Sequence, residues 1–152
     1  MASSGGPDLM FLLDTNVISE LKKAKTGRAN TAVIKWAESV PSRSMFISAI
    51  TVMELEMGTL LVERRDAIQG AMLRSWLNGQ VFPAYFGRIL MVDVQVAVRC
   101  AALHVPDRRS DRDALIAATA LVHGMTVATR NTSDFQATGV ALVNPWQHGS
   151  IR

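Results

Sequence analysis

The stretch FLLDTNVIS (residues 11–19) runs from apolar residues into an aspartate, Asp14, and then into residues that suit a helix. A short apolar run without polar alternation is typical of a strand buried on both faces of a parallel sheet. A charge directly after such a strand either begins a helix or belongs to a site at the edge of the sheet. The other acidic residues of the chain bear on which interpretation holds.

Four more apolar runs follow the first, and helical patterns separate them. The five runs are LMFLL (9–13), MFIS (45–48), RILMV (88–92), MTVAT (125–129) and VALV (140–143). Helices are predicted near residues 15–21, 30–40, 50–62, 66–79, 94–104 and 112–123. Strands that alternate with helices predict an α/β fold, in which helices cover both faces of a parallel sheet of about five strands.

Length and composition predict one globular domain. The chain has 152 residues, and we expect a single core over residues 9–147, a disordered tail at 1–8 and a short tail at 148–152. The hydrophobic share of 49% and the charged share of 19% are those of a globular protein. No apolar run reaches the ~20 residues that cross a bilayer, and no signal peptide is recognised, so a soluble cytoplasmic protein is predicted.

Several kinds of site lack their sequence motif here. The single cysteine, Cys100, has no partner for an internal disulfide, and no CxxC spacing indicates zinc. There is also no Ser-His-Asp pattern, Walker loop or GxGxxG. The formal net charge of +3 is mildly basic, which permits a nucleic-acid partner without requiring one.

Acidic residues stand at or near the start of several predicted helices. The simplest interpretation is capping, because a carboxylate there accepts free backbone N–H groups and faces the positive end of the helix dipole. Thr51 with Glu54, and Ser110 with Asp113, both have the spacing of a capping box. Taken singly, each acid is better explained as a cap than as a catalytic group. The acids are Asp14, Glu54, Asp93, Asp113 and Asp134.

Taken together, Asp14, Glu54 and Asp113 are expected to converge. Parallel strands finish at the same edge of a sheet, so residues just beyond their ends can share one crevice. Asp113 lies on the same side of its helix as Ala117 and Ala120, small residues that allow close approach to the sheet. Asp93 has no polar residue beside it, and we interpret it as a helix cap.

The position of Glu54 follows from the helical pattern of residues 50–62. With Ile50, Met53, Met57 and Leu61 taken as the inward stripe, Glu54 falls beside that stripe, whereas Glu56 falls on the exposed side. An acid on the inward side of a helix is costly unless something pairs with it. Glu54 is therefore expected to be functional and Glu56 an ordinary surface charge.

Three carboxylates in one crevice predict a metal ion. They repel one another and burial disfavours their ionisation, and a divalent cation relieves both effects. Oxygen ligands without Cys or His favour Mg²⁺ or Mn²⁺ over zinc. A metal-activated water is then the expected nucleophile.

Four segments in fixed order carry a resemblance to a known family. They are LLDTNVISEL (12–21), ISAITVMELEMG (47–58), DALIAATALVHGMTVATRNTSDF (113–135) and VNPW (143–146). In this order they resemble the PIN-domain endoribonucleases, especially the VapC-type toxins of bacterial toxin–antitoxin modules, with a FitB-like ending at NPW. The resemblance covers about Met10 to Trp146, nearly the whole expected domain.

The resemblance implies a three-layer αβα domain that cleaves RNA with bound Mg²⁺ or Mn²⁺. The resemblance implies that the residues of this chain at the family's catalytic and metal-binding positions are Asp14, Glu54 and Asp113. The fourth family position is either Asn131, which could bind through its carbonyl or position a water, or Asp134. The supporting residues it implies are Thr15, Asn16 and Thr129, and Arg130 is the candidate for a substrate phosphate.

The resemblance also implies partners: an RNA substrate, a cognate antitoxin protein and a second copy of the chain in a homodimer. Apolar side chains over residues 50–79 also support a homodimer. This support is slight, because the same side chains could equally belong to the core. They include Leu60, Leu61, Met72, Leu73 and Trp76. The alternative function is a catalytically inactive PIN-like module that acts as the dimeric partner of a DNA-binding antitoxin, with its acids serving as helix caps.

Overall fold

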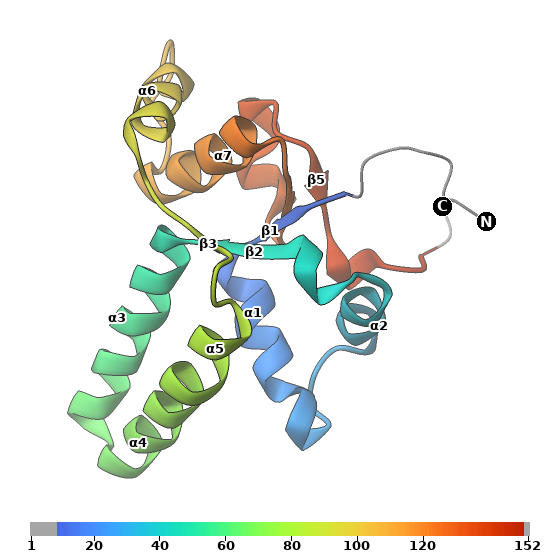
Figure 1. Cartoon of the computed structure of the whole chain (residues 1–152), viewed down its shortest axis with the longest axis vertical. Coiled ribbons are helices and arrows are strands. Elements are labelled where there is room, and N and C mark those ends of the chain that lie inside the picture. The colour runs from blue at the N-terminus through green and yellow to red at the C-terminus, as the bar shows by residue number, and fades with distance from the viewer. Residues whose placement is uncertain (1–8, 151–152) are drawn as a thin grey trace.

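The fold is a parallel five-stranded sheet, seen in a computed structural model that describes residues 9–150 (Figure 1). The strands are β1 (Phe11–Leu13), β2 (Met45–Ser48), β3 (Ile89–Leu90), β4 (Thr126–Ala128) and β5 (Leu142–Val143). Their order is β3-β2-β1-β4-β5 and every pairing is parallel. The predicted strands are confirmed, although most are shorter than their apolar runs. The tail predicted at residues 1–8 lies outside the described residues.

Helices cover both faces of the sheet, as predicted. They are α1 (Thr15–Lys22), α2 (Thr31–Ser39), α3 (Ala49–Arg65), α4 (Ala67–Trp76), α5 (Phe82–Ala84), α6 (Val94–Leu103) and α7 (Asp111–His123), with a π-helical turn at Leu77–Val81. Alternate residues of β1 pack on opposite faces of the sheet, because successive side chains of a strand point to opposite sides. Phe11 and Leu13 pack with Val17 and Trp36, and Leu12 packs with the α7 face.

The chain order places β1 at a topological switch point. β2 pairs with one edge of β1, and β4 pairs with the other. The backbone N–H of Asp14 donates to the carbonyl of Ala128 at 2.9 Å, so the carboxyl ends of β1 and β4 are joined directly. In open α/β sheets, ligands bind in the crevice outside the strand ends at such a point.

The inward stripe predicted for α3 is wrong. Its buried residues are Thr51, Leu55 and Thr59, whereas Met53 and Leu61 are 43% and 59% exposed. The helix can bury threonine because the Thr59 hydroxyl donates to the Leu55 carbonyl at 2.8 Å within the same helix. Met53 and Leu61 of the predicted stripe therefore face outward, whereas Ile50 packs against the core.

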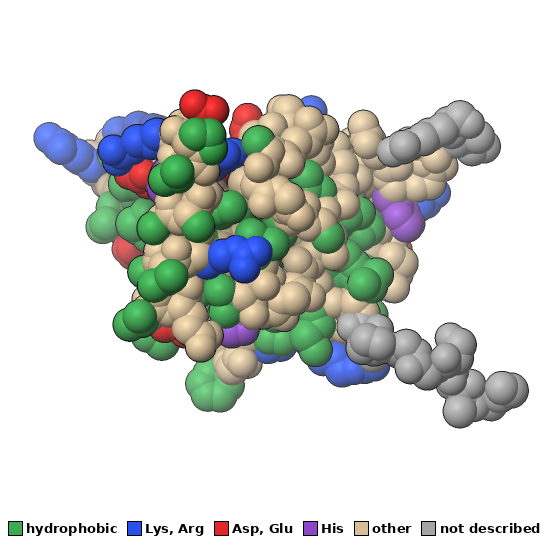
Figure 2. Space-filling model, turned by 90° about the horizontal axis from the view of Figure 1, so that it is seen from above, with side chains coloured by type: hydrophobic (Ala, Val, Ile, Leu, Met, Phe, Trp, Pro, Cys, Tyr) green, Lys and Arg blue, Asp and Glu red, His purple; other side chains and the backbone are tan. Residues whose placement is uncertain are grey.

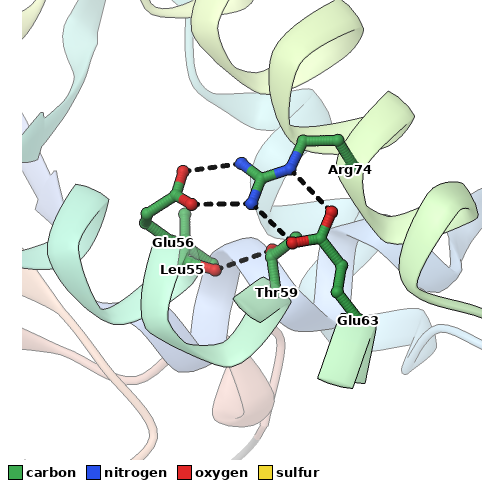
Figure 3. Close-up of polar contacts among 5 residues, drawn as sticks. All are labelled: Leu55, Glu56, Thr59, Glu63 and Arg74. Carbon is green, nitrogen blue, oxygen red and sulfur yellow. Dashed lines mark hydrogen bonds and ion pairs between the residues drawn. The ribbon is translucent and has the colours of Figure 1, made fainter. Parts of the chain in front are cut away.

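An ion-pair network joins α3 to α4 (Figure 3). Arg74 of α4 contacts both oxygens of Glu56 at 2.7 Å each, and it also donates to Glu63 at 3.0 and 3.2 Å. Glu56 lies at the surface, as predicted, but its two-point pair with Arg74 was not predicted. Gly70 permits the close crossing of the two helices, since a Cβ there would lie 2.5 Å from the Glu63 Cα.

Between residues 9 and 150, none of the helices combines the length and the apolar character that crossing a bilayer requires.

Candidate active site

A pocket of about 480 Å³ opens where the crevice was expected, and residues from both sides of the switch point line it. It contains all three predicted acids together with most of their predicted neighbours. The lining residues are Asp14, Thr15, Asn16, Ser19, Glu20, Lys23, Glu54, Asp113, Arg130, Asn131 and Trp146. The structure thus brings to one pocket side chains that lie far apart in the chain.

Asp14 is buried at the end of β1, where it also caps α1. One carboxylate oxygen, Oδ1, accepts the backbone N–H of Thr15 at 2.8 Å, and Oδ2 accepts the hydroxyl of Thr129 at 2.8 Å. Burial raises the pKa of this carboxyl, the two hydrogen bonds oppose that shift, and the nearby Glu54 and Asp134 charges add to it. The two fixed hydrogen bonds position the carboxylate despite its burial.

Glu54 enters the pocket from the first half of α3 and both of its oxygens have partners. Oε1 accepts the hydroxyl of Thr15 at 2.6 Å. Oε2 lies 3.5 Å from Nη1 of Arg112. Thr15 therefore links Asp14, through its backbone N–H, to Glu54, through its hydroxyl.

Asp113 reaches the pocket from the first turn of α7, which Ser110 caps by accepting the Asp113 backbone N–H at 3.4 Å. Ala117 and Ala120 are fully buried against the sheet, as predicted, and they bring the start of α7 close to it. Burial raises the pKa of Asp113, and the charges of Asp14, Asp134 and Glu54 raise it further. The pocket carboxylates are therefore close enough to repel one another.

Comparisons with known proteins agree with this geometry. The family model for the PIN domain matches residues 11–140, which is most of the chain. The chain belongs to the PIN domain family. Within it, the chain is 40% identical over 146 residues to the VapC ribonuclease Y4jK of Sinorhizobium fredii, covering 91% of this chain and 99% of that protein. It is also 38% identical over 142 residues to toxin FitB of Neisseria gonorrhoeae, covering 90% of this chain and 99% of that protein.

Solved structures of this PIN group share the fold. The crystal structure of FitAcB from Neisseria gonorrhoeae matches with a TM-score of 0.82 at 38% identity, covering 90% of this chain and 99% of that chain. The structure of FitAB bound to a DNA fragment matches with a TM-score of 0.81 at 37% identity, covering 90% and 96%. The predicted three-layer PIN-like fold is thus confirmed.

The two candidates for the fourth position of the PIN site occupy different places. Asn131 lines the pocket, and its backbone N–H donates to the Thr129 hydroxyl oxygen at 3.0 Å. Asp134 is exposed on a short 3₁₀ turn outside the lining, yet its charge raises the pKa of both Asp14 and Asp113. Asn131 is the residue placed to meet a ligand, and Asp134 adds negative potential nearby.

The predicted supporting residues form one hydrogen-bonded group. Thr129 donates to Asp14, and its oxygen accepts from Nδ2 of Asn16 at 3.4 Å. Asn16 in turn accepts the backbone N–H of Arg130 at 3.3 Å. These contacts fix the loop after β4 against the start of α1.

Arg130 lies over the ring of Trp146, with its guanidinium carbon 5.3 Å from the ring centroid. Trp146 packs against the core cluster of β1 and α2. Arg130 lines the pocket, and within residues 9–150 its guanidinium makes no hydrogen bond or ion pair, although its positive charge helps to lower the pKa of Glu20. The VNPW segment carried the family resemblance, but its role in holding Arg130 was not predicted.

The side chains suit a hard divalent cation chemically. Asp14, Glu54 and Asp113 supply only oxygen donors, and burial, followed by repulsion between carboxylates, raises the pKa of Asp14 and Asp113. As the side chains of residues 9–150 stand, however, no three Asp, Glu, His or Cys groups are close enough together to enclose an ion. Sharing an ion therefore requires a side chain to rotate, and Glu54, with three side-chain torsions, has the reach to do so.

The prediction that Asp93 caps a helix is confirmed. Its carboxylate accepts the Val96 backbone N–H at 3.0 Å at the start of α6, and it is exposed outside the pocket lining. Asp14, Glu54 and Asp113, which were predicted to converge, thus line the pocket, whereas Asp93, which was predicted only to cap a helix, does not.

Proposed function

We propose that this PIN domain is a metal-dependent endoribonuclease and the toxin of a toxin–antitoxin pair. The observation that carries the proposal is the pocket at the switch point, into which Asp14, Glu54 and Asp113 project from three separate elements. Burial and neighbouring charges raise the pKa of Asp14 and Asp113, and such carboxylates are characteristic of functional sites. The ribonuclease and toxin names of the relatives with 38–40% identity support the same assignment.

In this proposal Asp14, Glu54 and Asp113 hold Mg²⁺ or Mn²⁺, with Asn131 as the neighbouring fourth position. Such an ion, when bound, would supply Lewis-acid chemistry, lowering the pKa of water and polarising the scissile phosphate. One of these carboxylates would accept the proton that the attacking water releases. Thr15 and Thr129 hold Asp14 and Glu54 in place through their hydrogen bonds.

Arg130 is proposed to bind a substrate phosphate. Its guanidinium lies against Trp146, which restricts its motion, and its unpaired N–H groups match the oxygens of a phosphodiester. Contacts of this kind bind the nucleic-acid backbone without reading its sequence. An RNA substrate would place the reaction in the cytoplasm.

The direct test is cleavage of a labelled single-stranded RNA by the purified protein. We expect fragments with Mn²⁺ or Mg²⁺, none after removal of metal with EDTA, and recovery when Mn²⁺ is added in excess. The relatives solved as FitAB and FitAcB complexes support a protein antitoxin, so co-expression of the cognate antitoxin should restore growth to cells that express this chain. Absence of cleavage under all metal conditions would leave the inactive binding module as the better account.

We also propose that the chain forms a homodimer through the outward faces of α3 and α6. Leu60 and Leu61 of α3 and Val94 and Val98 of α6 are each more than half exposed. Both helices lie along the left side of the molecule in Figure 1. Figure 2 shows hydrophobic side chains at many points of the surface that includes α6 and α7. Exposed apolar area of this kind marks protein–protein contact sites.

The dimer proposal predicts that Leu60→Lys combined with Val98→Lys shifts the protein to a monomer in sedimentation at micromolar concentration. The reason is that two buried charges would be left unpaired in the interface. Ile68→Lys is the matched control, because Ile68 is 75% exposed on α4 and lies on neither proposed face. A double variant that sediments like the wild-type dimer would exclude these faces as the interface.

A further inference from the structure

Glu54 differs from Asp14 and Asp113, the other two proposed metal ligands, in the charge of its partner. Asp14 accepts hydrogen bonds from neutral donors, the Thr15 amide and the Thr129 hydroxyl. Glu54 instead faces a full positive charge, with Oε2 lying 3.5 Å from Nη1 of Arg112. Arg112 directly precedes Asp113 on α7, so the same turn of helix that supplies one acid supplies a cation to another.

The Arg112 contact has the features of an exchangeable pair. It joins one nitrogen to one oxygen at 3.5 Å, and the Arg112 side chain is 49% exposed. Arg74, by contrast, holds Glu56 through two bonds of 2.7 Å and Glu63 through two more. A single long contact in water-exposed surroundings contributes little stability, so it can break when a better partner arrives.

We propose that Arg112 is a positioning residue that holds Glu54 in place of a divalent cation and competes with that cation for the Glu54 carboxylate. The inference rests on the proposed function, since it assumes that the pocket acids bind a metal ion. It also accounts for the absence, among residues 9–150, of three acids close enough to enclose an ion. Glu54 joins Asp14 and Asp113 when the ion displaces the Arg112 guanidinium.

The test is calorimetric titration of Mn²⁺ into the full chain carrying Arg112→Gln. Removing the competitor is expected to tighten Mn²⁺ binding by about 2- to 5-fold, the upper part of the range for an exposed ion pair. Arg108→Gln is the matched control, because it removes the same charge from the neighbouring loop, where Arg108 pairs with Asp111 and not with Glu54. The control should change Mn²⁺ affinity by less than about twofold.

Two further variants and a thermal measurement separate competition from a general charge effect. Arg112→Lys keeps the charge and should return the affinity toward the wild-type value. In a Glu54→Gln background, Arg112→Gln should have no effect, because the group for which Arg112 competes is gone. The rise in melting temperature on adding Mn²⁺ should be larger for Arg112→Gln than for wild type, which gives a readout independent of activity.

Failure of the inference and failure of the proposed function give different results. If wild type binds Mn²⁺ in a Glu54-dependent way but Arg112→Gln binds no more tightly than Arg108→Gln, the competition is disproved and the metal site stands. If neither wild type nor Arg112→Gln binds Mn²⁺, both the metal site and the competition are disproved. Binding by Arg112→Gln that is tighter than wild type and lost with Glu54→Gln supports both.

Discussion

Replacing Asp14 with asparagine is expected to lower the rate of RNA cleavage by about a thousandfold or more, since a bound metal contributes several kcal/mol of transition-state stabilisation. Asp14 is the buried acid of the pocket, fixed by Thr15 and Thr129. Asparagine is itself a good N-cap, so α1 should form normally. The measurement is single-turnover cleavage of a labelled RNA, with circular dichroism to verify folding.

Asp93→Asn provides the control for this prediction. It makes the same chemical change at another strand-to-helix junction, where the carboxylate only caps α6. Its cleavage rate should match that of wild type. Equal rates for Asp14→Asn and wild type, with metal present, would remove Asp14 from the catalytic site.

Replacing Gly70 with alanine is expected to destabilise the fold by about 1–3 kcal/mol, the usual cost of overpacking a close contact. The added Cβ would lie 2.5 Å from the Cα and 2.9 Å from the backbone nitrogen of Glu63, so the backbones of α3 and α4 must separate. That separation would also strain the pairs from Arg74 to Glu56 and Glu63. Urea denaturation at equilibrium measures the change in the free energy of unfolding.

Gly58→Ala is the matched control within the same helix pair. A Cβ at Gly58 meets no atom within 4 Å, and the residue lies inside α3. Alanine there should be neutral or should stabilise by roughly 0.5–1 kcal/mol, because glycine is the poorer helix former. Destabilisation of similar size in both variants would show that the contact at Gly70 is not the cause.

The main features of the fold follow from local patterns that the sequence displays directly. The run before Asp14 is apolar throughout because β1 is central and buried on both faces, and helices flank both sides because the pairing is parallel. The convergence of Asp14, Glu54 and Asp113 follows from the same rule, since their elements begin at one edge of the sheet.

The parts that were wrong or missed depend on contacts between distant residues. The inward side of α3 was assigned by apolarity, but the helix buries Thr51 and Thr59 and leaves Met53, Leu60 and Leu61 exposed. A pattern within one helix does not show which of its sides packs against the rest of the chain. The partners of Glu56 and Glu54, Arg74 and Arg112, likewise depend on how α3 packs against α4 and α7.

The central claim is that Asp14, Glu54 and Asp113 share one divalent cation. The most direct test is a crystal structure of the protein soaked in Mn²⁺, with diffraction data collected at the manganese absorption edge. The claim predicts an anomalous peak bound by oxygens of all three side chains, with Glu54 no longer beside Arg112. An anomalous map with no peak between these carboxylates at saturating Mn²⁺ would contradict it.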